Sequence, residues 1–344
     1  MAFPISILDL SPVDSGSTGA QALQNTIALA RRADALGYTR FWLAEHHNST
    51  SIASSTPEIL IESIARETER IRVGSGGIML PNHPPLKIVE TFRVLEALHP
   101  GRIDLGIGRA PGTDQVTALA LRRAVEALGA DDFPQQLAEM FAFSGEGFPA
   151  GHPFRSISAS PSDVELPPVW LLGSSDYSAQ LAAAMGLAFA FAFHINPNNA
   201  LQALHAYREG FAPSAHLQQP QTLITASIVC AETDERAEEL ASTVDLAMIR
   251  IITGRSAPLA PPEEAMAYQY TPGERFQLAN TRTRLIIGSP SKVRAQITRL
   301  VEQTEADEAM LTTLIYGHEN RVRTLELLAE AFELQKLADK TLAS

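Results

Sequence analysis

The sequence is almost free of cysteine: Cys230 is the only one in 344 residues. A single thiol excludes an internal disulfide, and it excludes zinc or iron–sulfur sites that are built from several cysteines. A chain without disulfides is typical of a reducing compartment, and the amino-terminal residues lack the basic segment of a signal peptide. We therefore expect the protein in the cytoplasm.

Long apolar runs are also lacking, because the longest covers only residues 187–193. A membrane-spanning helix needs about 20 apolar residues, so we expect no membrane association.

Positive charge is scarce: 27 Lys and Arg face 39 Asp and Glu, which gives a net charge of −12. This balance repels nucleic-acid phosphates, so we expect no nucleic-acid partner, and an anionic small ligand needs a local cationic site.

What the sequence does contain is a regular alternation of two patterns. Apolar runs rich in strand-forming residues alternate with segments whose apolar residues follow a period of 3.6, which is typical of amphipathic helices. The strand-like runs cover residues 5–10, 40–45, 71–80, 102–108, 169–173, 187–193, 222–231 and 309–316. The helical segments include residues 21–36, 57–68, 85–98, 176–185, 199–208 and 232–251.

These eight strand–helix units predict the fold class. Apolar strands that alternate with helices indicate a parallel α/β sheet, and eight of them favour a closed (β/α)8 TIM barrel over an open doubly wound sheet. One such barrel accounts for residues 1–344 as a single domain. Two proline-rich stretches are expected to be irregular: an excursion at 145–168 before the fifth strand, and an insertion at 254–284 after the seventh strand. The second is either a lid or a plain surface insertion.

In a TIM barrel, functional side chains follow the carboxyl ends of the strands. His46 and His47 follow the second strand, and neighbours on an extended segment point in opposite directions. We therefore expect one of them to face the barrel mouth and the other to pack. His46 is a candidate catalytic residue, with a hydrogen-bonded structural histidine as the alternative. The pair lacks the spacing of a zinc motif, so no metal site is expected.

A candidate anion site follows the fourth and fifth strands. Hydroxyl groups and free amides at a helix amino terminus bind anions, and an arginine supplies the local cation that an acidic protein needs. The residues are Arg109, Ser174, Ser175 and Ser178. The alternatives are plain helix capping for the serines and a surface salt bridge for the arginine.

Gly76 and Gly77 interrupt an aliphatic strand, as expected either at a bulge or where a ligand approaches the backbone closely. Leu8 in the first strand and Phe193 at the end of the sixth are candidates for a substrate pocket. The sequence contains neither a G-x-G-x-x-G nor a P-loop motif, and it lacks the G-x-S-x-G motif of α/β-hydrolases.

These segments together resemble the bacterial luciferase-like flavin monooxygenase family, in its branch of single-polypeptide luciferase family oxidoreductases. The resemblance extends from residue 3 to residue 332 in the same order. It rests on RFWLAEHHN, IRVGSGGIMLPNHPP, GRIDLGIGRAPG, VWLLGSSDYSAQLAAAMG and the tail from GSPSKV to ELLAEAF. The fold of this family is a (β/α)8 barrel, which the periodicity also predicts.

The resemblance implies that reduced flavin mononucleotide (FMN) lies in the barrel mouth and that one atom of dioxygen passes to a small organic substrate, such as an aldehyde or ketone. The family's catalytic histidine falls on His46, with Glu45 beside it at the flavin site, and its non-prolyl cis peptide bond falls on Gly76–Gly77. Gly108 replaces the luciferase cysteine near the flavin. The phosphate-binding positions fall on Arg109, Ser174, Ser175 and either Tyr177 or Ser178, and Phe193 replaces a pocket tryptophan.

The resemblance also implies partners: a separate flavin reductase that supplies reduced FMN, and a second copy of the chain, paired through the helices after the second and third strands. Two alternatives stay open. One is hydride transfer with deazaflavin or with a flavin reduced by a nicotinamide. The other is a barrel that binds flavin or a partner without catalysis, which the polar groups at four strand ends disfavour.

Overall fold

The structure is a computed structural model that describes residues 3–110, 112–123 and 132–335. Its strands form a parallel sheet that closes on itself, because β10 pairs with β1 on one side and with β8 on the other. β3 and β4 share one of the eight barrel positions, so the predicted (β/α)8 barrel is confirmed. The strands are β1 Ile5–Asp9, β2 Arg40–Leu43, β3 Arg72–Ser75, β4 Ile78–Met79, β5 Ile103–Gly108, β6 Val169–Gly173, β7 Ala188–Ala192, β8 Thr222–Cys230, β9 Leu285–Gly288 and β10 Glu308–Thr312.

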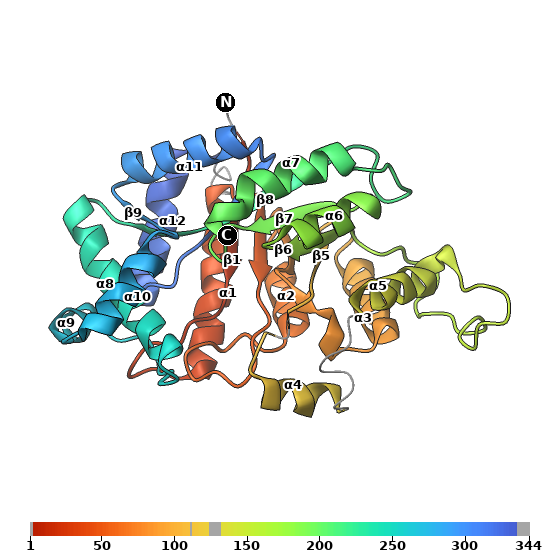
Figure 1. Ribbon diagram of the computed structural model, residues 1–344, viewed down its shortest axis with the longest axis horizontal. Coiled ribbons are helices and arrows are strands. Elements are labelled where there is room, and N and C mark those ends of the chain that lie inside the picture. Colours follow the sequence, from red (N-terminus) through yellow and green to blue (C-terminus); the bar gives the residue numbers. More distant parts are fainter. Residues whose placement is uncertain (1–2, 111, 124–131, 336–344) are drawn as a thin grey trace, which may run out of the picture.

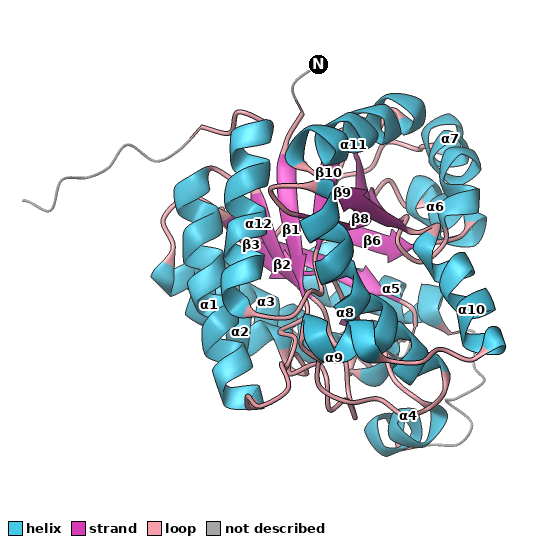
Figure 2. Ribbon diagram, turned by 90° about the vertical axis from the view of Figure 1, so that its left-hand side faces the viewer, coloured by secondary structure: helices cyan, strands magenta, loops and turns pink. Residues whose placement is uncertain are grey.

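Helices surround the strands on the outside of the barrel (Figures 1 and 2). Within the described residues, none of them is long and apolar enough to cross a membrane. The helices are α1 Gly19–Leu36, α2 Pro57–Glu67, α3 Pro85–Leu98, α4 Gln115–Arg122, α5 Phe133–Phe141, α6 Asp176–Ala184, α7 Ala200–Gly210, α8 Asp234–Ile252, α9 Pro262–Ala267, α10 Pro272–Arg282, α11 Pro290–Thr304 and α12 His318–Ala331.

The strand pattern differs from the prediction in two places. The run 71–80 is divided into β3 and β4, because the sheet pairing stops at Gly76 and Gly77. The additional strand β9 follows the predicted insertion. β9 pairs with the carboxyl-terminal part of β8, which is long enough, at 9 residues, to contact two strands. Residues 223–227 of β8 pair with β10, whereas residues 227–230 pair with β9.

The expectation that residues 254–284 are irregular is wrong, because they contain α9 and α10. Their prolines begin helices instead of breaking them: Pro262 and Pro272 occupy first-turn positions, where a helix needs no amide donor. A capping box also fixes the start of α10, in which the Thr271 hydroxyl accepts from the Glu274 amide and the Glu274 carboxylate accepts from the Thr271 amide. Both helices pack on α8.

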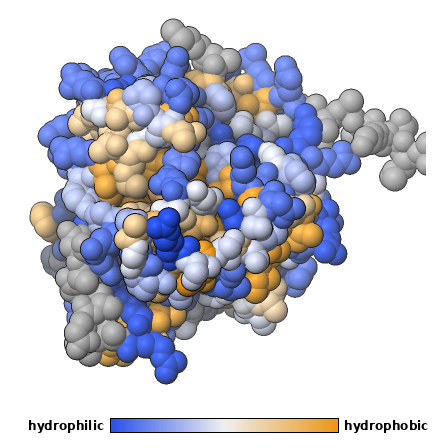
Figure 3. Space-filling model, turned by 90° about the vertical axis from the view of Figure 1, so that its right-hand side faces the viewer, coloured by the Kyte–Doolittle hydropathy of each residue, from blue (hydrophilic) through white to orange (hydrophobic). Residues whose placement is uncertain are grey.

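The excursion at 145–168 is irregular, as predicted: apart from the end of a helical turn at Ala142–Glu146, it contains no helix or strand. Its aromatic rings pack on one another, with Phe148 and His152 4.4 Å apart between ring centroids. In Figure 1 it is the yellow-green segment that projects on the right. Figure 3 shows the molecule from that side, with apolar patches among hydrophilic ones. Phe154 and Ile157 contribute exposed apolar side chains.

Charged side chains fill the lower part of the barrel. Asp104 is completely buried, and its carboxylate accepts hydrogen bonds from Arg40 at 2.7 Å, from Arg72 at 2.6 Å and from Trp42 Nε1 at 3.1 Å. Arg40 also bonds the buried carboxylate of Glu308 at 3.0 Å. Buried charges are tolerated only when they are paired and hydrogen-bonded, and here every carboxylate has such partners.

The variant Asp104→Asn tests this network. We expect the free energy of unfolding to fall by about 3–5 kcal/mol, because removal of one partner leaves buried guanidinium groups without their countercharge. The measurement is urea unfolding. Glu67→Gln makes the same chemical change in an exposed pair with Arg31, where we expect a loss of less than about 1 kcal/mol. Equal losses in the two variants would contradict the role given to Asp104.

Candidate active site

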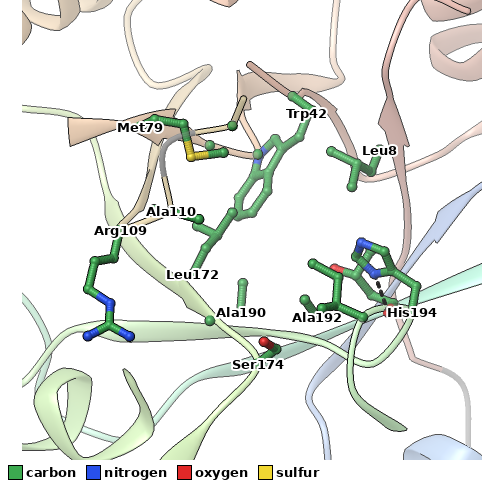
Figure 4. Close-up of a pocket in the computed structure, with 18 of the residues that line it drawn as sticks. Leu8, Trp42, Met79, Arg109, Ala110, Leu172, Ser174, Ala190, Ala192 and His194 are labelled. Atoms are coloured by element: carbon green, nitrogen blue, oxygen red, sulfur yellow. Dashed lines mark hydrogen bonds between the residues drawn. The ribbon is translucent and has the colours of Figure 1, made fainter. Parts of the chain in front are cut away.

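A cavity of about 420 Å³ opens at the carboxyl ends of the strands. Apolar side chains make up most of its wall, including Leu8 from β1, Trp42 from β2, Leu172 from β6 and Met310 from β10. Figure 4 shows Arg109 on one side of this cavity and His194 on the opposite side, with Trp42 and Leu172 between them. The cavity therefore has two polar ends and an apolar middle.

Two glycines form part of the wall between β3 and β4. The peptide bond Gly76–Gly77 is cis, as the resemblance implies, and both residues line the cavity. A Cβ atom on Gly76 would lie 2.6 Å from Cδ1 of Leu8, and one on Gly77 would lie 2.7 Å from the carbonyl oxygen of Gly106. Larger residues have no room here, so the cavity is bounded by bare backbone at this point.

The histidine pair separates as expected. His46 lines the cavity, whereas His47 turns to the carboxylate of Glu45, at 2.8 Å. Burial lowers the pKa of His46; the charge of Glu45 offsets this in part and His47 reinforces it. His46 is therefore neutral at neutral pH, a state in which one ring nitrogen donates and the other accepts. Its Nδ1 is buried and has no hydrogen-bond partner among the described residues.

Glu45 differs from the expectation, because its side chain is completely buried and does not line the cavity. Its carboxylate accepts hydrogen bonds from His47, from His83 at 2.9 Å and from the backbone amide of Met79 at 2.8 Å. These bonds join the loop after β2 to the segment after β4. Glu45 therefore ties the loop that carries His46 to the β4 end of the wall.

The residues of the predicted anion site, Arg109, Ser174, Ser175 and Ser178, all line this cavity. Ser175 precedes the first residue of α6, yet its hydroxyl makes no capping bond and lies 3.4 Å from the hydroxyl of Ser178. Plain capping thus does not account for Ser175. Hydroxyl groups and the free amides at a helix amino terminus are groups that can bind an anion.

Two neighbours of this site have supporting roles. Tyr177 does not line the cavity; its ring lies under the Arg109 guanidinium, 4.7 Å from ring centroid to Cζ, and holds that side chain by a cation–π contact. The one acidic residue in the first turn of α6, Asp176, is bound by Asn199 at 2.9 Å and Gln202 at 3.0 Å. These amides neutralise part of the repulsion that its carboxylate would exert on an anion.

Phe193 differs from the expectation as well, because it packs against the hydrophobic core and does not line the cavity. The next residue, His194, lines it instead. The alternation of side chains along β7 predicts a change of face at each residue, but the strand ends at Ala192 and a turn follows. No residue of 254–284 lines this cavity, so the lid alternative finds no support in the described residues.

Several lining residues were absent from the sequence-based candidates: Trp42, Met79, Leu172, His194, Thr225 and Met310. Most of them are apolar side chains inside strands, where a core position and a cavity position have the same pattern. Trp42 and Met310 lie on the inner face of the barrel. When both faces of a strand are apolar, the alternation of its side chains does not show which face is the inner one.

Comparison with known proteins adds the following. A family profile described as luciferase-like monooxygenase matches residues 1–308. The luciferase-like monooxygenase of Escherichia coli (strain K12) is 42% identical over 95% of this chain and 96% of its own length. The N-acetyl-S-alkylcysteine monooxygenase of Bacillus subtilis (strain 168) is 34% identical over 95% of this chain and 97% of its own length.

Two solved structures have a similar fold. Apo-MsnO8 superposes with a TM-score of 0.89 and 39% identity, covering 97% of this chain and 100% of that chain. The oxygenating constituent of 3,6-diketocamphane monooxygenase from Pseudomonas putida, solved in complex with FMN, gives a TM-score of 0.72 at 20% identity. It covers 99% of this chain and 100% of that chain.

The pair Glu45–His83 predicts a pH effect on stability. Burial lowers the pKa of His83, but the hydrogen bond and negative charge of Glu45 outweigh burial and raise it above 6.5. A raised folded-state pKa stabilises the protein below the pKa of unfolded histidine, about 6.5, and this contribution disappears as the pH rises through the folded-state pKa. Urea unfolding should therefore show that His83→Gln costs more stability at pH 6 than at pH 8.5.

The matched control is His205→Gln, which removes an exposed histidine paired with Glu209 on α7. We expect no comparable change with pH for this variant, because both side chains are largely solvated. A cost of His83→Gln that stays constant or grows between pH 6 and pH 8.5 would show that Glu45 does not hold a proton on His83.

Proposed function

The chain belongs to the luciferase-like monooxygenase family, and from this premise we propose that it uses reduced FMN and dioxygen to oxidise a small organic substrate with a carbonyl group, an aldehyde or ketone. Reduced FMN, when bound, activates dioxygen and supplies the oxygen atom that the substrate receives. The protein must then hold the phosphate, bound the ring system, place the substrate and keep water away. The lining residues divide among these tasks.

The anion site is the observation that carries the proposal of FMN. Arg109 provides a cation and three serine hydroxyls provide hydrogen-bond donors in a chain whose net charge is −12. Charge-assisted bonds to a phosphate are stronger than bonds between neutral groups, and a helix amino terminus adds a favourable dipole. Ser175 supports this assignment most directly, since it stands at a capping position without capping the helix.

The wall at Gly76–Gly77 suits a flat ring system. Both glycines line the cavity beside Trp42 and Met79, and they leave bare backbone against which a planar group can lie. His46 enters the same cavity, and the unsatisfied buried Nδ1 offers a hydrogen-bonding position. We assign His46 to hydrogen bonding or proton transfer at the reacting atoms, a role that its neutral imidazole suits.

The apolar middle of the cavity supports a substrate that is mostly hydrocarbon. Leu8, Leu172 and Met310 offer no hydrogen bonds, so a carbonyl compound would bury its carbon skeleton there. The related B. subtilis enzyme is named for a thioether-containing amino acid derivative. A sulfur atom would fit the same apolar environment, and this substrate class is the second candidate.

We propose two partners. A separate flavin reductase would supply the reduced FMN that the proposed reaction consumes. A second copy of the chain would pair through α2 and α3, where Ile59, Val94 and Leu98 are 65%, 47% and 58% exposed. Exposed apolar side chains on adjacent helices are typical of an interface. Hydride transfer with deazaflavin remains the alternative reaction.

The variant Arg109→Met tests the placement of the phosphate. Loss of a charge-assisted bond should weaken binding of FMN by about 10- to 100-fold, whereas riboflavin, which lacks the phosphate, should bind within about twofold of its original affinity. Flavin fluorescence quenching measures both. The control Arg31→Met removes an exposed arginine of α1 and should change neither affinity. If Arg109→Met weakens riboflavin as much as FMN, the phosphate does not lie at Arg109.

A further inference from the structure

His194 is a cavity residue to which the proposed reaction gives no task. It follows the carboxyl end of β7, and it lines the cavity together with Ala192 and Thr225. Two nitrogen atoms of His194 hydrogen-bond the same acceptor, the carbonyl oxygen of Thr225 on β8. The backbone nitrogen and the ring Nδ1 each lie 3.1 Å from this oxygen. The ring is therefore held in a fixed orientation (Figure 4).

This contact determines the tautomer of the ring. A carbonyl oxygen only accepts hydrogen bonds, so Nδ1 of His194 must carry the hydrogen. In a neutral imidazole, Nε2 then holds a lone pair and is an acceptor. Nε2 has no hydrogen-bond partner among the residues that the structure describes. The cavity thus contains an acceptor with a defined direction and no protein donor.

The ring is neutral under ordinary conditions. Burial lowers the pKa of His194; the bond to Thr225 opposes this in part, and the nearby His46 lowers it further. No carboxylate is among the residues that line the cavity, so no negative side chain there favours the imidazolium form. A neutral ring whose Nδ1 is occupied cannot donate to a carboxylate or to a carbonyl, and it can accept from O–H or N–H.

The position of His194 indicates which molecule it contacts. Figure 4 places it on the Leu8 side of the cavity, opposite Arg109. The phosphate is assigned to Arg109 and the serines, so a group that reaches His194 lies at the far end from the phosphate. The apolar residues Leu8 and Ala192 beside it fit the hydrocarbon part of a substrate.

We propose that His194 is a specificity-determining residue that accepts a hydrogen bond, through Nε2, from an uncharged hydroxyl or amide N–H group of the organic substrate. This inference rests on the proposed function for the location of the substrate. It narrows the substrate class to apolar molecules that carry an uncharged donor as well as the group that is oxidised. It disfavours molecules that would place a carboxylate at this end.

The tautomer is tested first, without any ligand. In protein labelled with ¹⁵N-histidine, two-bond ¹⁵N–¹H correlation spectra distinguish a nitrogen that carries hydrogen from one that does not, and His194→Gln identifies the signals by their loss. We expect a neutral ring with hydrogen on Nδ1 at pH 7.5. Hydrogen on Nε2, or a charged ring, would overturn the proposal.

The second test uses three probes with one carbon skeleton: 1-octanol, octanal and octanoate. Their dissociation constants are measured at pH 7.5 from tryptophan fluorescence, since Trp42 lines the cavity, in the FMN-loaded protein and in the protein without FMN. We expect 1-octanol to bind most tightly. In His194→Phe, the ratio of the 1-octanol constant to the octanal constant should rise by about three- to tenfold, the effect of one lost neutral hydrogen bond.

Two further variants serve as comparisons. His194→Gln can present its side-chain oxygen near the position of Nε2, and it should restore most of the ratio. His205→Gln changes an exposed histidine on α7, outside the cavity, and should leave the ratio unchanged. The fold should persist in His194→Phe, because the backbone amide of residue 194 still bonds the Thr225 carbonyl.

The outcomes separate this proposal from the proposed function. An unchanged ratio in His194→Phe, no measurable preference of the unaltered protein for 1-octanol over octanal, or tighter binding of octanoate overturns the role of His194. Weaker binding of FMN in His194→Phe, with an unchanged ratio, shows that the acceptor serves the cofactor and also overturns it. Failure of the unaltered protein to bind FMN counts against the proposed function alone, because the probes are also measured without FMN.

Discussion

The buried carboxylate of Asp104 is the constraint on which the architecture of the cavity depends. It accepts hydrogen bonds from Arg40, Arg72 and the indole of Trp42. These paired side chains occupy the interior of the barrel below the cavity. Trp42 also lines the cavity, so one carboxylate links the packing of the barrel interior to the shape of the wall. Arg40 also lies over the ring of Trp170, which packs edge-on against Trp42. In such a network, the charges of Asp104 and Arg40 determine the positions of the indole rings of Trp42 and Trp170.

Above this level the cavity separates two kinds of chemistry. At one end, Arg109 and the serine hydroxyls in and before the first turn of α6 would provide donors for an anion, and at the other end His194 would offer an acceptor to a neutral group. His46 is neutral because it is buried, and Glu45 positions it from behind without entering the cavity. In the proposed function, hydrogen-bonding capacity directs a phosphate and an uncharged substrate to opposite ends, with apolar side chains between them.

The sequence predicted the barrel because alternating strand and helix periods leave few other arrangements. It also predicted the positions of His46 and of the serines, since in this fold the carboxyl end of each strand lies at the mouth. It did not predict the contribution of Trp42 or Met310, because a strand buried on both faces has the same pattern whether a side chain meets a cavity or the core. The proline content of 254–284 predicts irregular structure, whereas Thr271 and Glu274 form a capping box that begins α10, a signal that the sequence does contain.

The role of Glu45 required the structure for a different reason. Its partner His83 lies 38 residues further along the chain, and only the closed barrel brings the loop after β2 beside the segment after β4. Likewise, the sequence placed Phe193 at the mouth, but the end of β7 at Ala192 gives the place to His194. Local periodicity fixes the side of a residue while a strand continues, and it loses that information at the turn that follows.

The most direct measurement of the central claim is an anaerobic titration of the purified protein with FMN and with a deazaflavin cofactor, each in oxidised and reduced form, followed by admission of dioxygen. The account predicts that reduced FMN binds most tightly and that bound reduced FMN is reoxidised with a transient spectral species before oxidised FMN appears. If only the deazaflavin binds, the reaction at this cavity is hydride transfer and not monooxygenation. Binding of neither cofactor below about millimolar concentration would contradict catalysis at this cavity.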